Sequence, residues 1–208
     1  MTLRLPLRAL SLSRPWTTAV EVHDKRAENR ERWTPHPHLM AQAERMVGED
    51  LALHSSGTYD RQGALYIQQQ TGVLYGRKDT PDKAVTSVVH VAGLLRPGDP
   101  CPPGQEAWYF GDTALLVEQV RVLTAPVFMS GGLGFWTVKD QYIPEIRAAL
   151  PSTDPDGADP DGADCTGCGR VADRRQRCTG CGAAVCVRCA RYDEDGELHC
   201  PECHGGAL

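Results

Sequence analysis

The chain has 208 residues, of which 41% are hydrophobic and 24% charged, a balance that excludes both wholesale disorder and an integral membrane protein. This length is enough for one or two domains. The net charge of -5 arises in residues 151–164, with 5 acids and no base, because residues 1–150 carry 16 of each and residues 165–208 carry 6 of each. Proteins that coat duplex DNA through bulk charge usually have a basic domain, so any nucleic-acid contact must come from a local patch.

The first residues, MTLRLPLRALSLSRPW, have the length of a targeting segment but not its pattern. Arg4, Arg8 and Arg14 interrupt the apolar run that a signal peptide needs, and no small-residue cleavage site follows. No stretch approaches the roughly 20 apolar residues of a membrane span. We therefore expect a cytoplasmic protein without a membrane span.

The first 150 residues mix short strand and helix patterns. Leu3–Ser13 alternates partly, as a strand does, and Pro15 suits the first turn of a helix that runs to about Asp24. Pro37–Val47 has the spacing of an amphipathic helix, and Pro144–Leu150 would be a closing helix. Few short helices among scattered strands favour an α+β fold with a small barrel over a doubly wound sheet. The strand candidates are Leu51–His54, Thr86–Leu95, Ala114–Leu123 and Phe135–Val138.

Residues 151–164 read PSTDPDGADPDGAD, in which DPDGAD occurs twice. Pro and Gly oppose a helix, the like charges repel one another, and no apolar side chain is available for burial. A calcium loop is the functional alternative, but an EF-hand needs Gly at its sixth position, Glu at its twelfth and flanking helices. The segment is therefore interpreted as an acidic, disordered linker.

Eight of the nine cysteines form four C-x-x-C pairs within residues 165–203. Each pair can direct two thiolates at one ion, so two ions with four thiolates each account for all eight. Zinc is the favoured metal because it is soft enough for thiolate and has no redox chemistry. The expected ligands are Cys165, Cys168, Cys178, Cys181, Cys186, Cys189, Cys200 and Cys203.

Other cysteine chemistries fit this segment less well. Disulfides are disfavoured in a chain without a secretion signal, an iron–sulfur cluster would use four of the eight cysteines at other spacings, and a thioredoxin-type site needs one C-x-x-C on a βαβ unit. The segment also has too few large apolar residues to fold without a metal. Structural zinc in a finger over residues 165–204 is the stronger hypothesis.

The run RRQRCTGCGAAVCVRC, Arg174–Cys189, resembles the FYVE-type zinc finger. That resemblance implies a cross-braced treble clef, although the gap after Cys181 is also compatible with sequential pairing. Where the family holds a phosphoinositide head, this chain has Gln176, Arg177 and Thr179, so a protein or nucleic-acid partner is favoured over a phosphoinositide. The resemblance implies that one ion takes Cys165, Cys168, Cys186 and Cys189, and the other Cys178, Cys181, Cys200 and Cys203.

Several stretches in order along residues 1–150 resemble the ASCH domain, a relative of the PUA RNA-binding barrel. Leu10–Trp16 is a strand that enters a helix through Pro-Trp, and His23–Arg30 is similar to the family's G-x-K-x-x-E-x-R motif, with His23 in place of Gly. Leu51–Ser55 matches the following strand, and Ala125–Val127 with Gly131–Trp136 matches the closing strand. The resemblance implies a PUA-like β-barrel with flanking helices.

The charged motif then implies a binding site for RNA or a modified nucleotide. Side chains 28 and 30 point to one face of a strand because they are two apart, and a Lys, a carboxylate and an Arg in a barrel mouth can recognise a base edge and hold a phosphate. Salt-bridged surface charges and core tryptophans are the structural alternatives. The candidate nucleic-acid-binding residues are Arg14, Trp16, Lys25, Glu28, Arg30 and Trp136.

The same resemblance leaves a hydrolase open. Some ASCH-like proteins resemble amidohydrolases of acylated pyrimidine nucleosides, and others resemble ribonucleases. Lys25 and Glu28 would then be catalytic, together with Glu118. Glu28 stands where the amidohydrolases have Thr, and a carboxylate beside Lys25 favours the ammonium over the free base. The nearby histidines are interpreted as ordinary barrel residues: His23, His54 and His90.

Three functions therefore remain. The first is binding of RNA or a modified nucleotide, with the zinc finger as a second binding surface. The second is a hydrolase that acts on RNA or modified nucleosides in the same pocket. The third is an adaptor that binds a protein through the finger.

Overall fold

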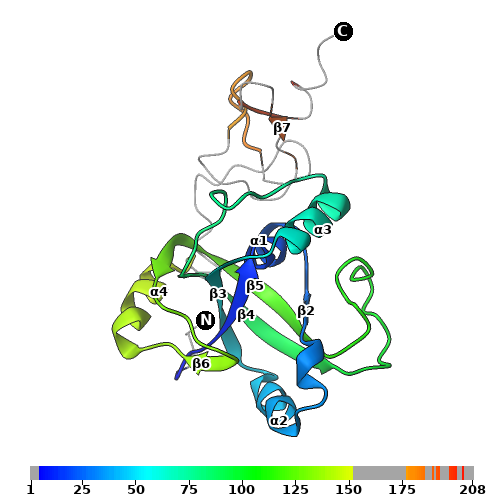
Figure 1. Ribbon diagram of the computed structural model, residues 1–208. Helices are drawn as coiled ribbons and strands as arrows, with labels where there is room; N and C mark the ends of the chain where they lie inside the picture. The colour runs from blue at the N-terminus through cyan, green and yellow to red at the C-terminus, as the bar shows by residue number, and fades with distance from the viewer. Residues whose placement is uncertain are drawn as a thin grey trace. The chain divides into compact units, whose positions relative to one another are not determined.

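The structure is a computed structural model that describes residues 5–151, 177–185, 189, 191–192, 197–200 and 203 (Figure 1). The chain divides into two compact units, Met1–Pro151 and Ser152–Leu208. Apart from Pro151, the linker expected at residues 151–164 lies outside the described residues. Within the described parts of the chain, no helix has both the length and the apolarity to cross a membrane.

Six strands of the first unit form one mixed sheet in the order β2-β5-β4-β3-β1-β6. β1 pairs in parallel with β3, and every other neighbouring pair is antiparallel. β2 and β6 are the edges, and no ladder of the described residues joins them, so the pairing by itself does not show the closed barrel that was expected. The strands are Arg8–Arg14 (β1), Ala27–Asn29 (β2), Asp50–Tyr59 (β3), Ala84–Leu95 (β4), Ala114–Phe128 (β5) and Phe135–Thr137 (β6).

Four short helices flank the sheet, and Figure 1 places α1 and α3 at one end of it and α2 at the other. Local signals mark their ends: a proline opens α2 and α4, and the Asp60 side chain caps α3 by accepting a hydrogen bond from Gly63 N. Gly63 is required because Trp16 Nε1 lies 2.6 Å from the position of any Cβ there. The helices are Trp16–Val22 (α1), Pro37–Met46 (α2), Arg61–Thr71 (α3) and Ile143–Ala149 (α4).

Both faces of the central strands are buried. Leu51 and Leu53 on β3 pack with α1 and α2 residues in one apolar cluster, whereas Ala52 between them packs with α4 residues in another. Successive strand residues point to opposite faces, so a continuous apolar run such as Leu51–Leu53 indicates a strand covered on both sides. The central strands are therefore covered on both faces by apolar side chains.

The α+β expectation and its flanking helices are confirmed, and the predicted elements lie within a few residues of the observed ones. The helix α3 was not predicted, whereas β2 contains Glu28, which was expected on a strand. β3 and β5 also extend past their predicted ends, to Tyr59 and Phe128, where register shifts bend the ladders. Bulges of this kind interrupt the alternation of apolar residues on which the sequence-based prediction depends.

The described part of the second unit is small and is built around cysteines. Arg191–Tyr192 (β7) pairs in antiparallel with Leu198–His199 (β8), and Arg177 forms a bridge with Ala184. The buried cluster consists of Cys178, Ala184, Val185 and Cys200. Three of the expected metal ligands lie outside the described residues: Cys165, Cys168 and Cys186.

Candidate functional site

Lys25 is a fully buried lysine at the turn between α1 and β2. Its side chain enters the protein because α1 ends at Val22 and Asp24 adopts a left-handed φ of 53°. Lys25 is 1% exposed, its Nζ donates a hydrogen bond to Glu28 Oε2, and it lies 5.7 Å from the centre of the Trp16 ring. A buried ammonium is costly unless a carboxylate compensates it, and Glu28 has this role.

Glu28 lies between two cations. Its second oxygen, Oε1, lies 3.0 Å from Arg30 Nη2, and the Arg30 guanidinium lies 5.5 Å from the Trp33 ring centre. Glu28 is on β2, paired with Leu115 of β5, so the sheet edge sets its position. The three charged residues of the motif therefore form one continuous ionic chain.

Burial and neighbouring charges together shift the pKa values of Lys25 and Glu28. Burial lowers the pKa of Lys25 below its ordinary value, although Glu28 opposes the shift. Burial alone would raise the pKa of Glu28, but the charges of Lys25 and Arg30 outweigh it and leave the pKa below its ordinary value. Glu28 is thus a carboxylate at neutral pH. The sequence shows only the carboxylate near Lys25, because burial of the amine is not visible in a sequence.

Lys25 and Glu28 line a cavity of about 400 Å³, here called the acidic pocket. Trp16 is one aromatic residue of its wall, and its Nε1 donates a 2.9 Å hydrogen bond to Asp60 Oδ2. Phe110 is the other, a residue that is 55% exposed. Four carboxylate residues and one lysine make the lining acidic. The remaining lining residues are Asn29, Glu31 and Asp112.

Asn29 holds the Phe110 segment against the charged motif. Its Nδ2 donates to Trp108 O at 2.7 Å, and its Oδ1 accepts from Phe110 N at 3.1 Å. Gln105 adds a second attachment, because its Oε1 accepts from the backbone N–H groups of Arg26 and Ala27. Residues 105–110 are therefore fixed to β2, and Phe110 is held at the pocket.

The structure brings together only part of the predicted set. Trp16, Lys25 and Glu28 line the acidic pocket, whereas Arg30 lines a second cavity of about 590 Å³. Arg14 lines neither pocket: it is buried and donates to the carbonyl oxygens of Arg77 and Gly57 at 2.9 and 3.0 Å.

Two further predicted residues lie elsewhere in the first unit. Trp136 packs against the α4-side core, and its Nε1 donates to Ser11 Oγ at 3.1 Å. Glu118 is exposed on β5 opposite His90, and neither residue lines the acidic pocket. The described geometry therefore does not bring Glu118 to Lys25.

Sequence reasoning missed most of the acidic wall. Asp60 had a recognisable signal, because Asp before Arg61 and Gly72 after Thr71 are the ends of a capped helix. Phe110 and Asp112 lie in a loop without a motif, and they reach the pocket only because Asn29 and Gln105 attach that loop to β2. No local pattern contains those long-range bonds.

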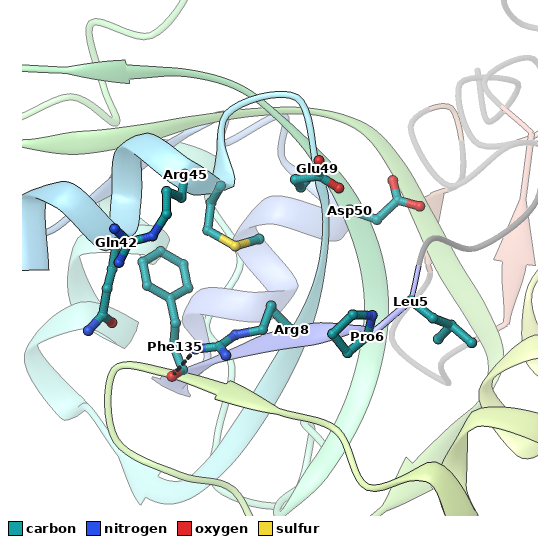
Figure 2. A pocket seen from close by; sticks show the side chains of 9 residues that line it. Leu5, Pro6, Arg8, Gln42, Arg45, Glu49, Asp50 and Phe135 are labelled. Atoms are coloured by element: carbon teal, nitrogen blue, oxygen red, sulfur yellow. Dashed lines mark hydrogen bonds between the residues drawn. The ribbon is translucent and has the colours of Figure 1, made fainter.

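Another cavity, of about 600 Å³, lies beside α2 (Figure 2). Its lining contains two arginines and two acidic residues, so it prefers no charge class of ligand. Arg8 donates to Phe135 O at 2.8 Å, and Asp50 lies 2.8 Å from Arg121 Nη2. Because Arg8 and Asp50 already bind protein groups, the acidic pocket is the better candidate site.

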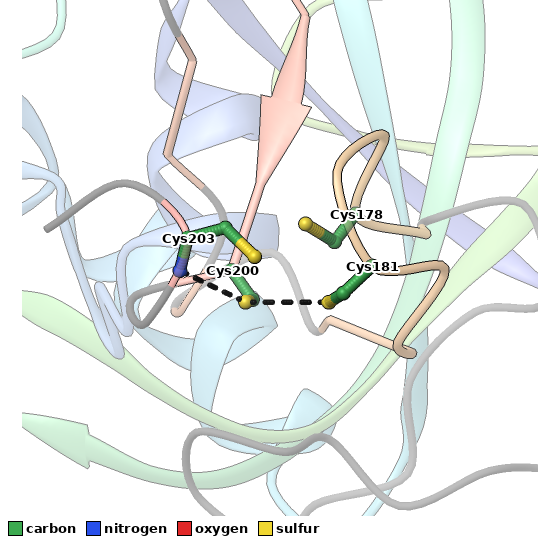
Figure 3. Close-up of side chains that lie close together, drawn as sticks. All are labelled: Cys178, Cys181, Cys200 and Cys203. Atoms are coloured by element: carbon green, nitrogen blue, oxygen red, sulfur yellow. Dashed lines mark hydrogen bonds between the residues drawn. The ribbon is translucent and has the colours of Figure 1, made fainter. Parts of the chain in front are cut away.

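The second unit contains a candidate metal centre. The Sγ atoms of Cys178, Cys181, Cys200 and Cys203 all lie within 4.8 Å of one another, and Figure 3 shows them pointing to a common point. None of the described cysteines is in a disulfide. The two halves are joined where Thr179 N donates to Leu198 O at 2.8 Å. This is the grouping that the FYVE-type resemblance implied for one of its ions.

These four sulfurs fit one thiolate-bound metal ion. A tetrahedral zinc site with bonds of about 2.3 Å places its sulfurs roughly 3.8 Å apart, and Cys181 Sγ lies 3.8 Å from Cys200 Sγ. The pKa of Cys178 is lowered to about 5, mainly by a hydrogen bond from the backbone of Cys200. The pKa of Cys203 is raised to about 12 by hydrogen bonds with the other sulfurs, of which the bond with Cys181 has the largest effect. A divalent cation held by these four residues would remove this competition and let all four be thiolates.

Comparison with known proteins gives a distant likeness to a solved structure. No family model matches the chain, and no curated protein matches it. Among solved structures, the chain is similar to the crystal structure of a mutant of the ZmASCH protein from Zymomonas mobilis, with 13% identity and a TM-score of 0.38. The similarity covers 70% of this chain and 97% of that chain. At this score the likeness assigns no family.

The Glu28→Gln variant tests the ionic chain. Loss of the carboxylate leaves Lys25 buried without its partner, so the free energy of unfolding should fall by about 3–5 kcal/mol at pH 7. Because the folded pKa of Glu28 is lowered, its contribution is present above the unfolded pKa of about 4.3 and is lost as the pH falls through the folded pKa. Urea unfolding at pH 7 and below pH 4 measures both effects.

The exposed Glu31→Gln is the matched control, with an expected change within about 0.5 kcal/mol. The ionic chain would be contradicted if both variants lost the same free energy of unfolding. It would also be contradicted if the loss in Glu28→Gln were as large below pH 4 as at pH 7.

The Cys200→Ser variant tests the metal centre. Purified wild-type protein should contain bound zinc, and this variant should contain one ion fewer per chain because the four-sulfur site is broken. Elemental analysis after exhaustive dialysis gives the number of zinc ions per chain. Cys101→Ser, at an exposed cysteine outside the cluster, should leave this number unchanged. Equal metal content in Cys200→Ser and the wild type would rule the site out.

Proposed function

We propose that the protein binds RNA or a modified nucleotide, with a base entering the acidic pocket of an ASCH/PUA-like domain over residues 1–150. The observation that supports this most directly is the buried Lys25–Glu28 pair in the lining of a cavity that also has the Trp16 and Phe110 rings. Residues of the charged motif that carry the ASCH resemblance are thus located at a pocket. Buried polar groups beside aromatic rings are the usual means of recognising an unpaired base.

The charge of the pocket identifies the part of the ligand that enters it. Glu28, Glu31, Asp60 and Asp112 outnumber Lys25, so a phosphate in this lining would face four carboxylates. Carboxylates instead accept hydrogen bonds from the ring N–H and exocyclic amino groups of bases. The base or nucleoside portion is therefore the part that fits, and the phosphate must lie outside this pocket.

The second unit would add a structural finger. In this proposal residues 165–204 form a two-zinc, FYVE-like treble clef that presents a second surface to nucleic acid or to a protein, and residues 151–164 are a flexible tether. The sulfur cluster of Cys178, Cys181, Cys200 and Cys203 supports one of the two ions. When bound, zinc supplies structural cross-linking of the finger.

A hydrolase in the same pocket is the second candidate, and the lowered pKa of Lys25 favours it. A neutral Lys25 amine could take a proton from water while the hydroxide attacks an acyl carbonyl of a modified nucleoside. The carbon–nitrogen bond would then break, and the proton would pass to the leaving amine. Glu28 would orient Lys25 rather than act as nucleophile, because both of its oxygens face cations.

The Phe110→Ala variant tests nucleotide binding. Base–aromatic stacking contributes about 1–3 kcal/mol, so affinity for a fluorescein-labelled, mixed-sequence 12-nucleotide RNA should fall roughly 5- to 150-fold. Fluorescence anisotropy with the full chain gives the dissociation constants. Phe128 is 64% exposed and lines no pocket named above, so the control variant Phe128→Ala should bind as the wild type does. Equal affinity of the two variants, or no RNA binding by the wild type, would overturn the proposal.

The Lys25→Met variant tests turnover. If the pocket is a hydrolase, wild-type protein should deacylate N4-acetylcytidine or cleave the RNA, and the variant should be about 100- to 10,000-fold slower because it lacks the proton acceptor. Product mass is followed by mass spectrometry, and circular dichroism checks that the variant is folded. Lys139→Met is the control at an exposed lysine. Absence of product with the wild type would eliminate these two reactions.

A further inference from the structure

The cavity lined by Arg30, here called the basic pocket, has the opposite charge character from the acidic pocket. Arg30 and Lys83 contribute positive charge, and five side-chain hydroxyl groups and a glycine-rich loop, Gly131–Gly134, complete most of its wall. None of the described residues that line it is acidic. Two cations, several hydroxyls and exposed backbone are the donor set that binds an oxyanion.

His54 supplies neither a positive charge nor a free basic nitrogen to this pocket. Its Nε2 lies 3.1 Å from Met129 O and must donate to that carbonyl, so Nδ1 accepts from the Ser11 hydroxyl, also at 3.1 Å. Trp136 Nε1 in turn donates to Ser11 Oγ. Burial lowers the pKa of His54, in agreement with this neutral tautomer. The hydrogen bonds that link Trp136, Ser11, His54 and Met129 therefore form a rigid support.

That support places the glycine backbone at the pocket wall. A Cβ on Gly131 would lie 2.4 Å from His54 Cε1 and 2.6 Å from Ser11 Oγ, and a Cβ on Gly132 would lie 2.8 Å from Trp136 Cγ. Only glycine allows this approach. The N–H groups of Gly131 and Gly132 donate to no other described residue, so they are available to a ligand.

Arg30 connects the two pockets. Its Nη2 lies 3.0 Å from Glu28, which lines the acidic pocket, while its side chain, 21% exposed, lines the basic one. Its Nε is buried and has no hydrogen-bond partner among the described residues. Lys83 has a left-handed φ of 51° and directs its side chain past Gly57, which also lines the basic pocket. Arg30 is thus held by an ion pair, and Lys83 is exposed beside Gly57 in the lining of the same pocket.

We propose that the basic pocket is a phosphate site, which holds the phosphate of the ligand whose base enters the acidic pocket. This inference rests on the proposed function, which requires a phosphate position outside the acidic lining. Arg30 and Lys83 bind the phosphate oxygens by charge, and the Gly131 and Gly132 N–H groups and the pocket hydroxyls complete the hydrogen bonds. The ligand class is a nucleotide or an RNA phosphodiester rather than a free nucleoside.

The first experiment uses inorganic phosphate and isotope-labelled full-length protein. Titration with sodium phosphate at constant ionic strength should shift the NMR amide signals of Gly131, Gly132 and Lys83, and Lys83→Gln should weaken the response several-fold. Lys139→Gln is the charge-matched control: it follows β6, which runs antiparallel to β1 away from Ser11 and Ser13. Unmoved glycine signals in the wild type, or equal responses in the two variants, would overturn the phosphate site.

The second experiment measures the salt dependence of binding to the labelled 12-nucleotide RNA. Loss of one phosphate contact on a single strand should reduce the slope of log affinity against log salt by about 0.7 in Lys83→Gln and leave it unchanged in Lys139→Gln. RNA binding that depends on Phe110 but not on Lys83 would overturn the phosphate site and leave the proposed function standing. Phosphate binding without RNA binding would support the site but refute the proposed nucleotide function.

Discussion

The first unit depends on a buried carboxylate held between two cations. Glu28 contacts Lys25 through one oxygen and Arg30 through the other, and none of these groups could be buried alone without a large desolvation cost. The three groups come from one short segment, in which a turn with left-handed Asp24 follows α1 and a strand of three residues lies at the sheet edge. The pockets are built on this rigid segment.

The ionic chain also separates two electrostatic environments. Glu28 lies in a lining with three other carboxylates, whereas Arg30 lies in a lining that contains no acidic residue among those described. A ligand that spans both must therefore carry its hydrogen-bond donors at one end and its negative charge at the other. A nucleotide has this polarity, and an isolated anion or an isolated base has only half of it. Shape alone would not make this distinction.

Different interactions are available to stabilise the two units. The first buries both faces of a sheet, so that consecutive residues such as Leu51 and Ala52 pack into separate cores. The second has a buried cluster of two cysteines, one alanine and one valine in its described part, which is too small to order a chain by the hydrophobic effect. Four converging sulfurs can replace that core with metal–thiolate bonds. A ligand cluster therefore substitutes for apolar area.

The sequence alone determined the α+β class, most helix and strand positions, the cysteine pairs and the charged motif, because each depends on local spacing or on residue type. It did not indicate that Lys25 is buried, that Arg14 and Trp136 bind other protein groups, or that Glu118 lies away from the pocket. It also missed Phe110 and Asp112, which are brought in by hydrogen bonds between residues about 80 positions apart. Burial and long-range contacts exist only in the folded chain, and they decided which residues form the site.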